Sequence, residues 1–235
     1  MEDKFIQNPR YVIEDAIKAR DLPKLLAKAG ELHGHFCPFL ALGVKAAVQA
    51  VNELGVSSTG MEEVIAIIET NNCFSDGVQF VTGCSFGNNA LIYRDYGKTA
   101  FTLAKRNGEA IRMSVKDISR LLEEREPEAQ RLFQKVVIER QGTNEDQRRL
   151  RENWRRIGFK MLDIPDDELF DVNRTTTQVP AYSRIFASVK CSICGENVME
   201  PRARIQNGQP VCIPCSGQEY NQLAGDGISL ARKEN

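Results

Sequence analysis

The chain has 235 residues, enough for one large domain or two smaller ones. Its 31 basic and 32 acidic residues leave a net charge of -1, so no overall field favours nucleic acid or an acidic membrane. Residues 2–4 are charged and no long apolar run follows them. We therefore expect no secretory signal, no membrane-spanning helix and a cytoplasmic location.

The first region, residues 1–115, is predicted to begin with helices and continue with strands. Its apolar residues recur at helical spacing or gather in short runs. They predict helices over 9–19, 22–30 and Pro38–Leu54, strands over Val64–Ile68, Leu91–Tyr93, Thr99–Ala104 and Ala110–Val115, and a short helix capped by Ser75 or Asp76. This order predicts an α+β fold with N-terminal helices packed on a mainly antiparallel sheet.

The second region, residues 116–178, is highly charged and is predicted to be a mostly helical segment. Its charge run is typical of a solvated helix face rather than a binding patch. A helix is expected to start within Ile164–Phe170, and Asn173–Pro180 reads as a polar linker or an edge strand. The third region, residues 179–235, is predicted to be a linker followed by a small cysteine module.

Two cysteine pairs define that module. Cys191-x-x-Cys194 and Cys212-x-x-Cys215 can place four thiolates around one zinc ion, and a redox CxxC pair is the alternative. The turn between them, Asn207-Gly208, predicts a hairpin, and a short helix is expected around residues 219–223. These features describe a zinc-ribbon or treble-clef module with structural zinc. Its balanced charges favour contact with protein over nucleic acid.

The N-terminal region concentrates both histidines beside a cysteine. His33 and His35 lie within four residues of Cys37, which stands just before a predicted helix. The N–H groups at the helix start would favour the thiolate of Cys37, which is both a metal ligand and a nucleophile. The alternative is a buried histidine beside an unreactive core cysteine.

Further polar and thiol groups follow the predicted strand over Val64–Ile68. Cys73 and Asp76 come just after it, and a ligand site at such a strand end is an analogy with parallel α/β sheets. Cys84 lies in a loop rich in glycine and asparagine that could present backbone N–H groups, and Lys98 precedes another strand. For catalysis the candidates are Cys37, Asp76 and Lys98, the last two as proton-handling groups.

Four segments in this order resemble the FmdE family, which is named for formylmethanofuran dehydrogenase: His33–Pro38 with Leu42-Gly43 beyond it, Cys73–Gln79, Thr82–Asn88 and Asp95–Lys98. The resemblance covers about residues 10–115, and the cysteine module resembles the zinc-binding tail of some members. It implies a homodimeric α+β domain with a second metal, zinc or another transition metal, in a cleft. The ligand candidates that it implies are His35, Cys37, Cys73 and Cys84, with His33 as a substitute. The loop after Cys84 lacks the family's usual lysine, so its anion contact is not expected here.

Whether the chain is an enzyme stays open at this point. The family name implies an oxidoreductase with a molybdenum or tungsten pterin, but the chain has no iron–sulfur cysteine run, and no cofactor-binding residues are identified. One interpretation is a metal-dependent protein of one-carbon or molybdopterin-linked metabolism. A second is a non-enzymatic metal carrier or docking accessory of a larger dehydrogenase complex. A nucleic-acid regulator that uses the zinc module is the least favoured.

Overall fold

The computed structural model describes residues 6–119 and 126–232, which form two compact units that divide between Pro180 and Ala181. The division lies next to residue 179, where the sequence predicts that the linker and cysteine module begin. None of the described helices is long and apolar enough to cross a membrane.

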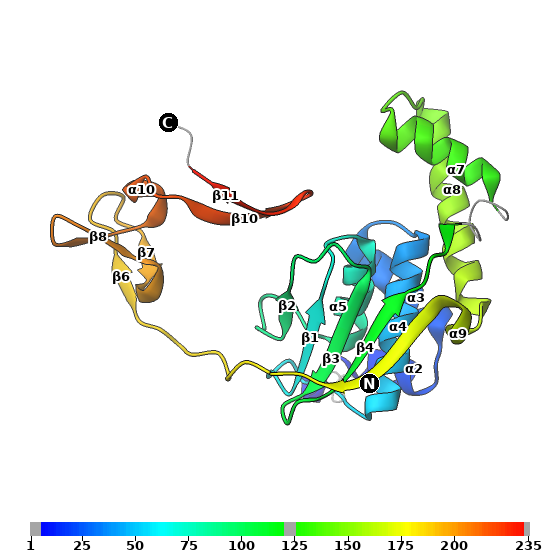
Figure 1. The fold of residues 1–235 in the computed structure, drawn as a ribbon, viewed down its shortest axis with the longest axis horizontal. Coiled ribbons are helices and arrows are strands. Elements are labelled where there is room, and N and C mark those ends of the chain that lie inside the picture. Colours follow the sequence, from blue (N-terminus) through cyan, green and yellow to red (C-terminus); the bar gives the residue numbers. More distant parts are fainter. Residues whose placement is uncertain (1–5, 120–125, 233–235) are drawn as a thin grey trace. The chain divides into compact units, whose positions relative to one another are not determined.

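The first unit consists of a five-stranded sheet with helices packed against it (Figure 1). The strand order is β2-β1-β3-β4-β5, in which β1 pairs with β2 in parallel and the other pairings are antiparallel. The fold class is therefore α+β with a mainly antiparallel sheet, as predicted. The helices are α2 (Tyr11–Lys18), α3 (Leu22–His33), α4 (Pro38–Leu54) and α5 (Cys73–Thr82), and the strands are β1 (Val64–Ile68), β2 (Leu91–Tyr93), β3 (Ala100–Lys105), β4 (Glu109–Val115) and β5 (Phe170–Thr176).

Local sequence signals set the ends of these helices. Pro38 occupies the first turn of α4, and Gly55 ends that helix with a φ of 65°. Helix α5 begins earlier than predicted, because Asn72 is its cap: the Asn72 side chain accepts a hydrogen bond from Phe74 N at 3.0 Å. Asp76 consequently lies inside the first turn of α5, and its carboxylate is not used to cap the helix.

Helices α4 and α5 approach each other closely through two glycines. A Cβ atom on Gly43 would lie 2.1 Å from the carbonyl oxygen of Phe74, and one on Gly77 would lie 2.6 Å from the carbonyl oxygen of Leu40. Any side chain at these positions would push the helices apart. Since α4 starts just after Cys37 and α5 starts at Cys73, this contact also brings the two cysteines together.

The helical segment predicted over 116–178 is part of the first unit rather than a unit of its own. Helix α8 packs on α4, and the buried amino group of Lys45 in α4 donates to Leu162 O at 2.9 Å. Strand β5 pairs with β4 along seven residues and is an edge strand of the sheet. The remaining elements here are α7 (Pro127–Phe133), the π-helix η1 (Gln134–Ile138), α8 (Asn144–Lys160), the 3₁₀ helix η2 (Met161–Asp163) and α9 (Asp166–Leu169).

The second unit has a small core of Cys191, Val211 and Cys212, against which Val198 and Cys215 pack. The hairpin predicted around Asn207-Gly208 is present. The helix expected over 219–223 is wrong, because this segment pairs as a strand with residues 227–231 across a glycine-containing turn. The elements are β6 (Ser188–Lys190), β7 (Asn197–Met199), η3 (Glu200–Arg202), β8 (Arg204–Gln206), β9 (Gln209–Val211), α10 (Ile213–Ser216), β10 (Tyr220–Ala224) and β11 (Gly227–Ala231).

Candidate metal centres

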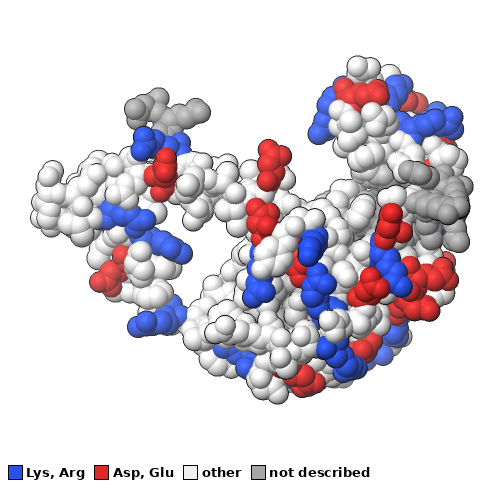
Figure 2. Space-filling view, viewed as in Figure 1, with Lys and Arg blue, Asp and Glu red and all other residues white. Residues whose placement is uncertain are grey.

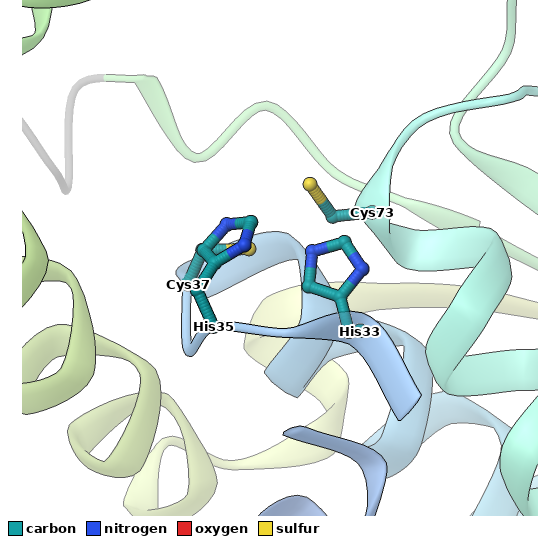
Figure 3. Close-up of side chains that lie close together, drawn as sticks. All are labelled: His33, His35, Cys37 and Cys73. Atoms are coloured by element: carbon teal, nitrogen blue, oxygen red, sulfur yellow. The ribbon is translucent and has the colours of Figure 1, made fainter. Parts of the chain in front are cut away.

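Four side chains of the first unit converge on one point, and we call them the N-terminal metal group: His33, His35, Cys37 and Cys73. Their ligand atoms all lie within 4.8 Å of one another. Figure 3 shows the four side chains close together. His33 ends α3, because Gly34 turns the chain out of the helix with a φ of 86°. Cys37 caps α4, and Cys73 is the first residue of α5. The four side chains of the group therefore come from the ends of three helices and from the turn between α3 and α4.

The His33 ring is held in an orientation that suits a metal ligand. Its Nδ1 lies 2.7 Å from a carboxylate oxygen of Asp76, so we assign the ring proton to this bond. In this tautomer Nε2 carries a lone pair, and Nε2 is buried with no hydrogen-bond partner among the described residues. Metal-binding histidines characteristically give their other nitrogen to a carboxylate in this way. The residues present thus fit a metal ion.

The two thiols of the group lie side by side and shift each other's pKa. The neighbouring Cys37 thiol, with a further contribution from His33, lowers the pKa of Cys73 to about 6. The pKa of Cys37 is raised, because Cys73 lies beside it and because it is buried. Burial, with the His33 ring beside it, also lowers the pKa of His35, which favours a neutral imidazole. Two imidazoles and two thiols form a donor set that suits zinc and other late transition metals.

A cavity of about 350 Å³, which we call the aromatic pocket, opens onto this group. His35, Cys37 and Cys73 line one end of it, whereas Trp154 and Phe133 line its wall from α8 and α7. This wall is not predicted from the sequence, in which α8 reads as a charged solvated helix. The sequence feature that could have indicated this wall is Trp154, the single tryptophan of the chain, which lies within an arginine-rich helix.

The structure places the other predicted site residues differently. Asp76 belongs to the site as the partner of His33. Cys84 does not join the metal group: its buried thiol donates to Val64 O at 3.5 Å, and burial raises its pKa to about 11. Lys98 is exposed and is not among the described residues that line the aromatic pocket. Cys84 cannot reach the metal group because it follows the C-terminal end of α5, whereas Cys73 is at the N-terminal end of the same helix.

The four cysteines of the second unit form the tail metal group, Cys191, Cys194, Cys212 and Cys215, whose sulfur atoms lie within 4.8 Å of one another. The Cys194 and Cys212 sulfurs are 3.9 Å apart. Tetrahedral zinc with 2.3 Å bonds to sulfur requires about 3.8 Å between sulfurs. Backbone N–H groups also point at the thiolates: Cys212 N lies 3.3 Å from the Cys191 sulfur. Such bonds from Cys194 and Cys212 lower the pKa of Cys191 to about 6.

The fold and the two groups define an α+β metal-binding protein with a zinc-binding tail. Residues 32–171 match the family described as "FmdE, Molybdenum formylmethanofuran dehydrogenase operon", and the chain belongs to this family. Residues 184–220 match the prokaryotic dksA/traR C4-type zinc finger. Both parts of the resemblance seen in the sequence are therefore confirmed.

The chain is also similar to one named relative and, in fold, to one solved structure. It is 40% identical over 222 residues to a protein of Archaeoglobus fulgidus named "Probable S-adenosyl-L-methionine-binding protein", with 92% of this chain and 58% of that protein covered. The chain thus spans less than two thirds of that relative. It is also similar in fold to the crystal structure of a tungsten formylmethanofuran dehydrogenase FmdE-like protein from Syntrophus aciditrophicus. The TM-score is 0.53 at 21% identity, over 83% of this chain and 92% of that one.

Proposed function

We propose that the N-terminal metal group binds one transition-metal ion, zinc or a similar metal, and that this ion acts on a small molecule held in the aromatic pocket. The observation that carries the proposal is the buried Nε2 of His33, which has no hydrogen-bond partner in the described parts of the chain. It converges with two thiols and a second imidazole at one end of the pocket. A buried polar atom without a partner is costly, and a metal bond would remove that cost.

The protein's own groups have distinct parts in this function. His35, Cys37 and Cys73 face the pocket, whereas His33 does not line it, so a bound ion would be approached from the pocket side. A metal in this position supplies Lewis acidity. Asp76 acts as a positioning residue, because its carboxylate holds the His33 ring. The family name supports a role in one-carbon or molybdopterin-linked metabolism.

Two other functions stay open as proposals. The relative named for S-adenosyl-L-methionine favours binding of that compound by this chain. An accessory role, in which a homodimer carries metal and the tail contacts a larger dehydrogenase, would use the same two metal groups. On the face shown in Figure 2, acidic and basic side chains are interspersed, which favours protein contacts over nucleic acid.

Metal content of the full chain, purified without added metal, tests the main proposal. We expect about two metal ions per chain in the wild type, because each group supplies four donors. Cys37→Ala should reduce this to about one, whereas the matched control Cys84→Ala removes a buried thiol outside the group and should leave it at two. About one ion per chain in all three proteins would contradict the proposal.

Binding of S-adenosyl-L-methionine, measured by calorimetry on the same proteins, separates the second candidate. Equal affinity in the wild type and in metal-depleted Cys37→Ala would favour a nucleoside-binding function that does not need the metal. If binding of S-adenosyl-L-methionine requires the metal, metal binding and binding of this compound take place at the same site.

A further inference from the structure

The aromatic pocket has the size of a small-molecule site. Its volume of about 350 Å³ lies near the lower end of the range for ligand pockets. It is too small for a polymer and is bounded at one end by three residues of the N-terminal metal group. A ligand in it would therefore lie next to the ion that we propose there.

The wall of the pocket favours a planar ring. The Trp154 indole lies 5.9 Å from the Phe133 ring and 5.7 Å from the His35 ring, centroid to centroid. Ile157 and Ile118, both buried, add aliphatic surface. Aromatic faces attract other rings in offset or edge-to-face arrangements, beyond the gain from burial alone. Trp154 thus links the apolar wall directly to one of the metal-group residues.

The charge of the lining favours an uncharged ligand. Apart from the residues of the N-terminal metal group, Glu126 alone is charged among the described lining residues, and it is already paired. Its carboxylate accepts hydrogen bonds from Arg156 and from Lys160, the latter at 3.0 Å. The described lining therefore offers no unpaired cation for a phosphate or carboxylate. Gln130 and Ser119 leave one or two polar contacts for neutral groups.

From these features we infer that the aromatic pocket takes a small uncharged molecule with a planar ring and a donor atom. The ring lies against Trp154, and the donor points toward the ion held by the N-terminal metal group. This inference rests on the proposed function, since the donor needs a metal to bind. It adds the ligand class and assigns Trp154 as a specificity-determining residue.

The test uses the full chain with zinc in the tail and cobalt(II) added to the N-terminal group, at pH 8. The probe is 4-phenylimidazole, which carries a phenyl ring beside its imidazole nitrogen donor and is uncharged at this pH, and imidazole is the matched ligand without the phenyl ring. Changes in the cobalt absorption bands report entry of the nitrogen donor. We expect 4-phenylimidazole to bind about tenfold more tightly than imidazole.

Two variants locate the effect. Trp154→Leu should remove most of the preference for 4-phenylimidazole over imidazole, because the contact with the phenyl ring is lost. Phe159→Leu is the control on the same helix: Phe159 packs against Phe36 and is not among the described residues that line the aromatic pocket. It should keep the preference.

The outcomes distinguish the ligand class from the metal function. If cobalt binds but the two ligands bind equally, or if Trp154→Leu weakens both alike, the ligand class is wrong and the metal function stands. If the cobalt spectrum equals that of Cys37→Ala, no ion occupies the N-terminal group, and the proposed function fails together with the inference.

Discussion

At the scale of single residues, the N-terminal metal group depends on one hydrogen bond between helices, from His33 to Asp76. His33 and Asp76 are 43 residues apart, and their 2.7 Å contact determines which ring nitrogen is left for a metal. The sequence placed Asp76 in the correct half of the domain as a proton-handling group. Only the folded chain shows that its carboxylate is directed at His33, so that it orients a ligand.

Asp76→Ala should weaken metal binding at the N-terminal group about 10- to 100-fold, the usual cost of losing such a partner. The tail zinc should be retained. Competition with a chelator, followed separately for the two ions, measures this. Asp171→Ala removes an exposed carboxylate outside the site and should change neither affinity. Unchanged N-terminal affinity in Asp76→Ala would mean that the contact does not orient the ligand.

At the scale of elements, the crossing of α4 and α5 builds the site. Gly43 and Gly77 let the two backbones touch, and the helix starts then place Cys37 and Cys73 side by side. Nothing in the neighbouring sequence of either glycine explains why a glycine is needed there. The reason is steric, because neighbouring backbone atoms fill the space that a Cβ would need.

Gly43→Ala should destabilise the first unit by about 3 kcal/mol, because backbone atoms cannot yield as a flexible side chain would. Urea unfolding measures the change, and metal affinity should fall with it. Gly87→Ala is the control, since nothing lies within 4 Å of a Cβ there, and its effect should stay within about 0.5 kcal/mol. Equal stability of the two variants would contradict the packing argument.

The contact between α7 and α8 includes a cluster of charged groups, in which Glu126 pairs with Arg156 and Lys160. This cluster should respond to acid. Hydrogen bonds from Arg156, with Lys160 beside it, lower the pKa of the largely buried Glu126 below its ordinary value of 4.5. A depressed folded-state pKa contributes stability that is present above the unfolded value and is lost as the pH falls through the folded value. The contacts of α7 with α8 should therefore weaken in acid.

Fluorescence of Trp154, the single tryptophan, reports this change. The wild type should lose stability as the pH is lowered from about 5 to 3, while Glu126→Gln should be less stable at pH 7 and lose less over this interval. Glu145→Gln, which removes an exposed ion pair with Arg148 on α8, should behave as the wild type does. Identical acid profiles for Glu126→Gln and the wild type would contradict the assignment.

At the scale of the whole molecule, the chain consists of two compact units with separate sources of stability. The first has an extended hydrophobic core, whereas the cluster of buried residues in the described part of the second is small and includes two cysteines of the tail metal group, Cys191 and Cys212. A module this small needs the folding energy that zinc supplies. Loss of the tail metal should therefore leave the first unit intact.

Cys194→Ala should remove one zinc per chain and unfold the tail, which proteolysis after residue 181 would reveal. The urea midpoint of the first unit should not move. Ser192→Ala, which alters the same turn without removing a ligand, should keep both zinc and protease resistance. A shift in the midpoint of the first unit would show that the two units share stability.

The sequence by itself determined the features that depend on short spacing. Two CxxC turns predict the tail zinc group, Pro38 marks the start of α4, and the order of elements predicts an α+β fold. Each of these follows from contacts within a few residues, where backbone geometry leaves few alternatives.

Only the tertiary structure decided which distant residues meet. Cys73 joins the N-terminal metal group and Cys84 does not, although both are candidates in the sequence. Trp154 becomes a wall of the pocket, and residues 170–176 complete the sheet rather than link two domains. The physical reason is that these contacts depend on helix crossing and strand pairing over long separations. Side-chain packing sets both, and no local pattern encodes them.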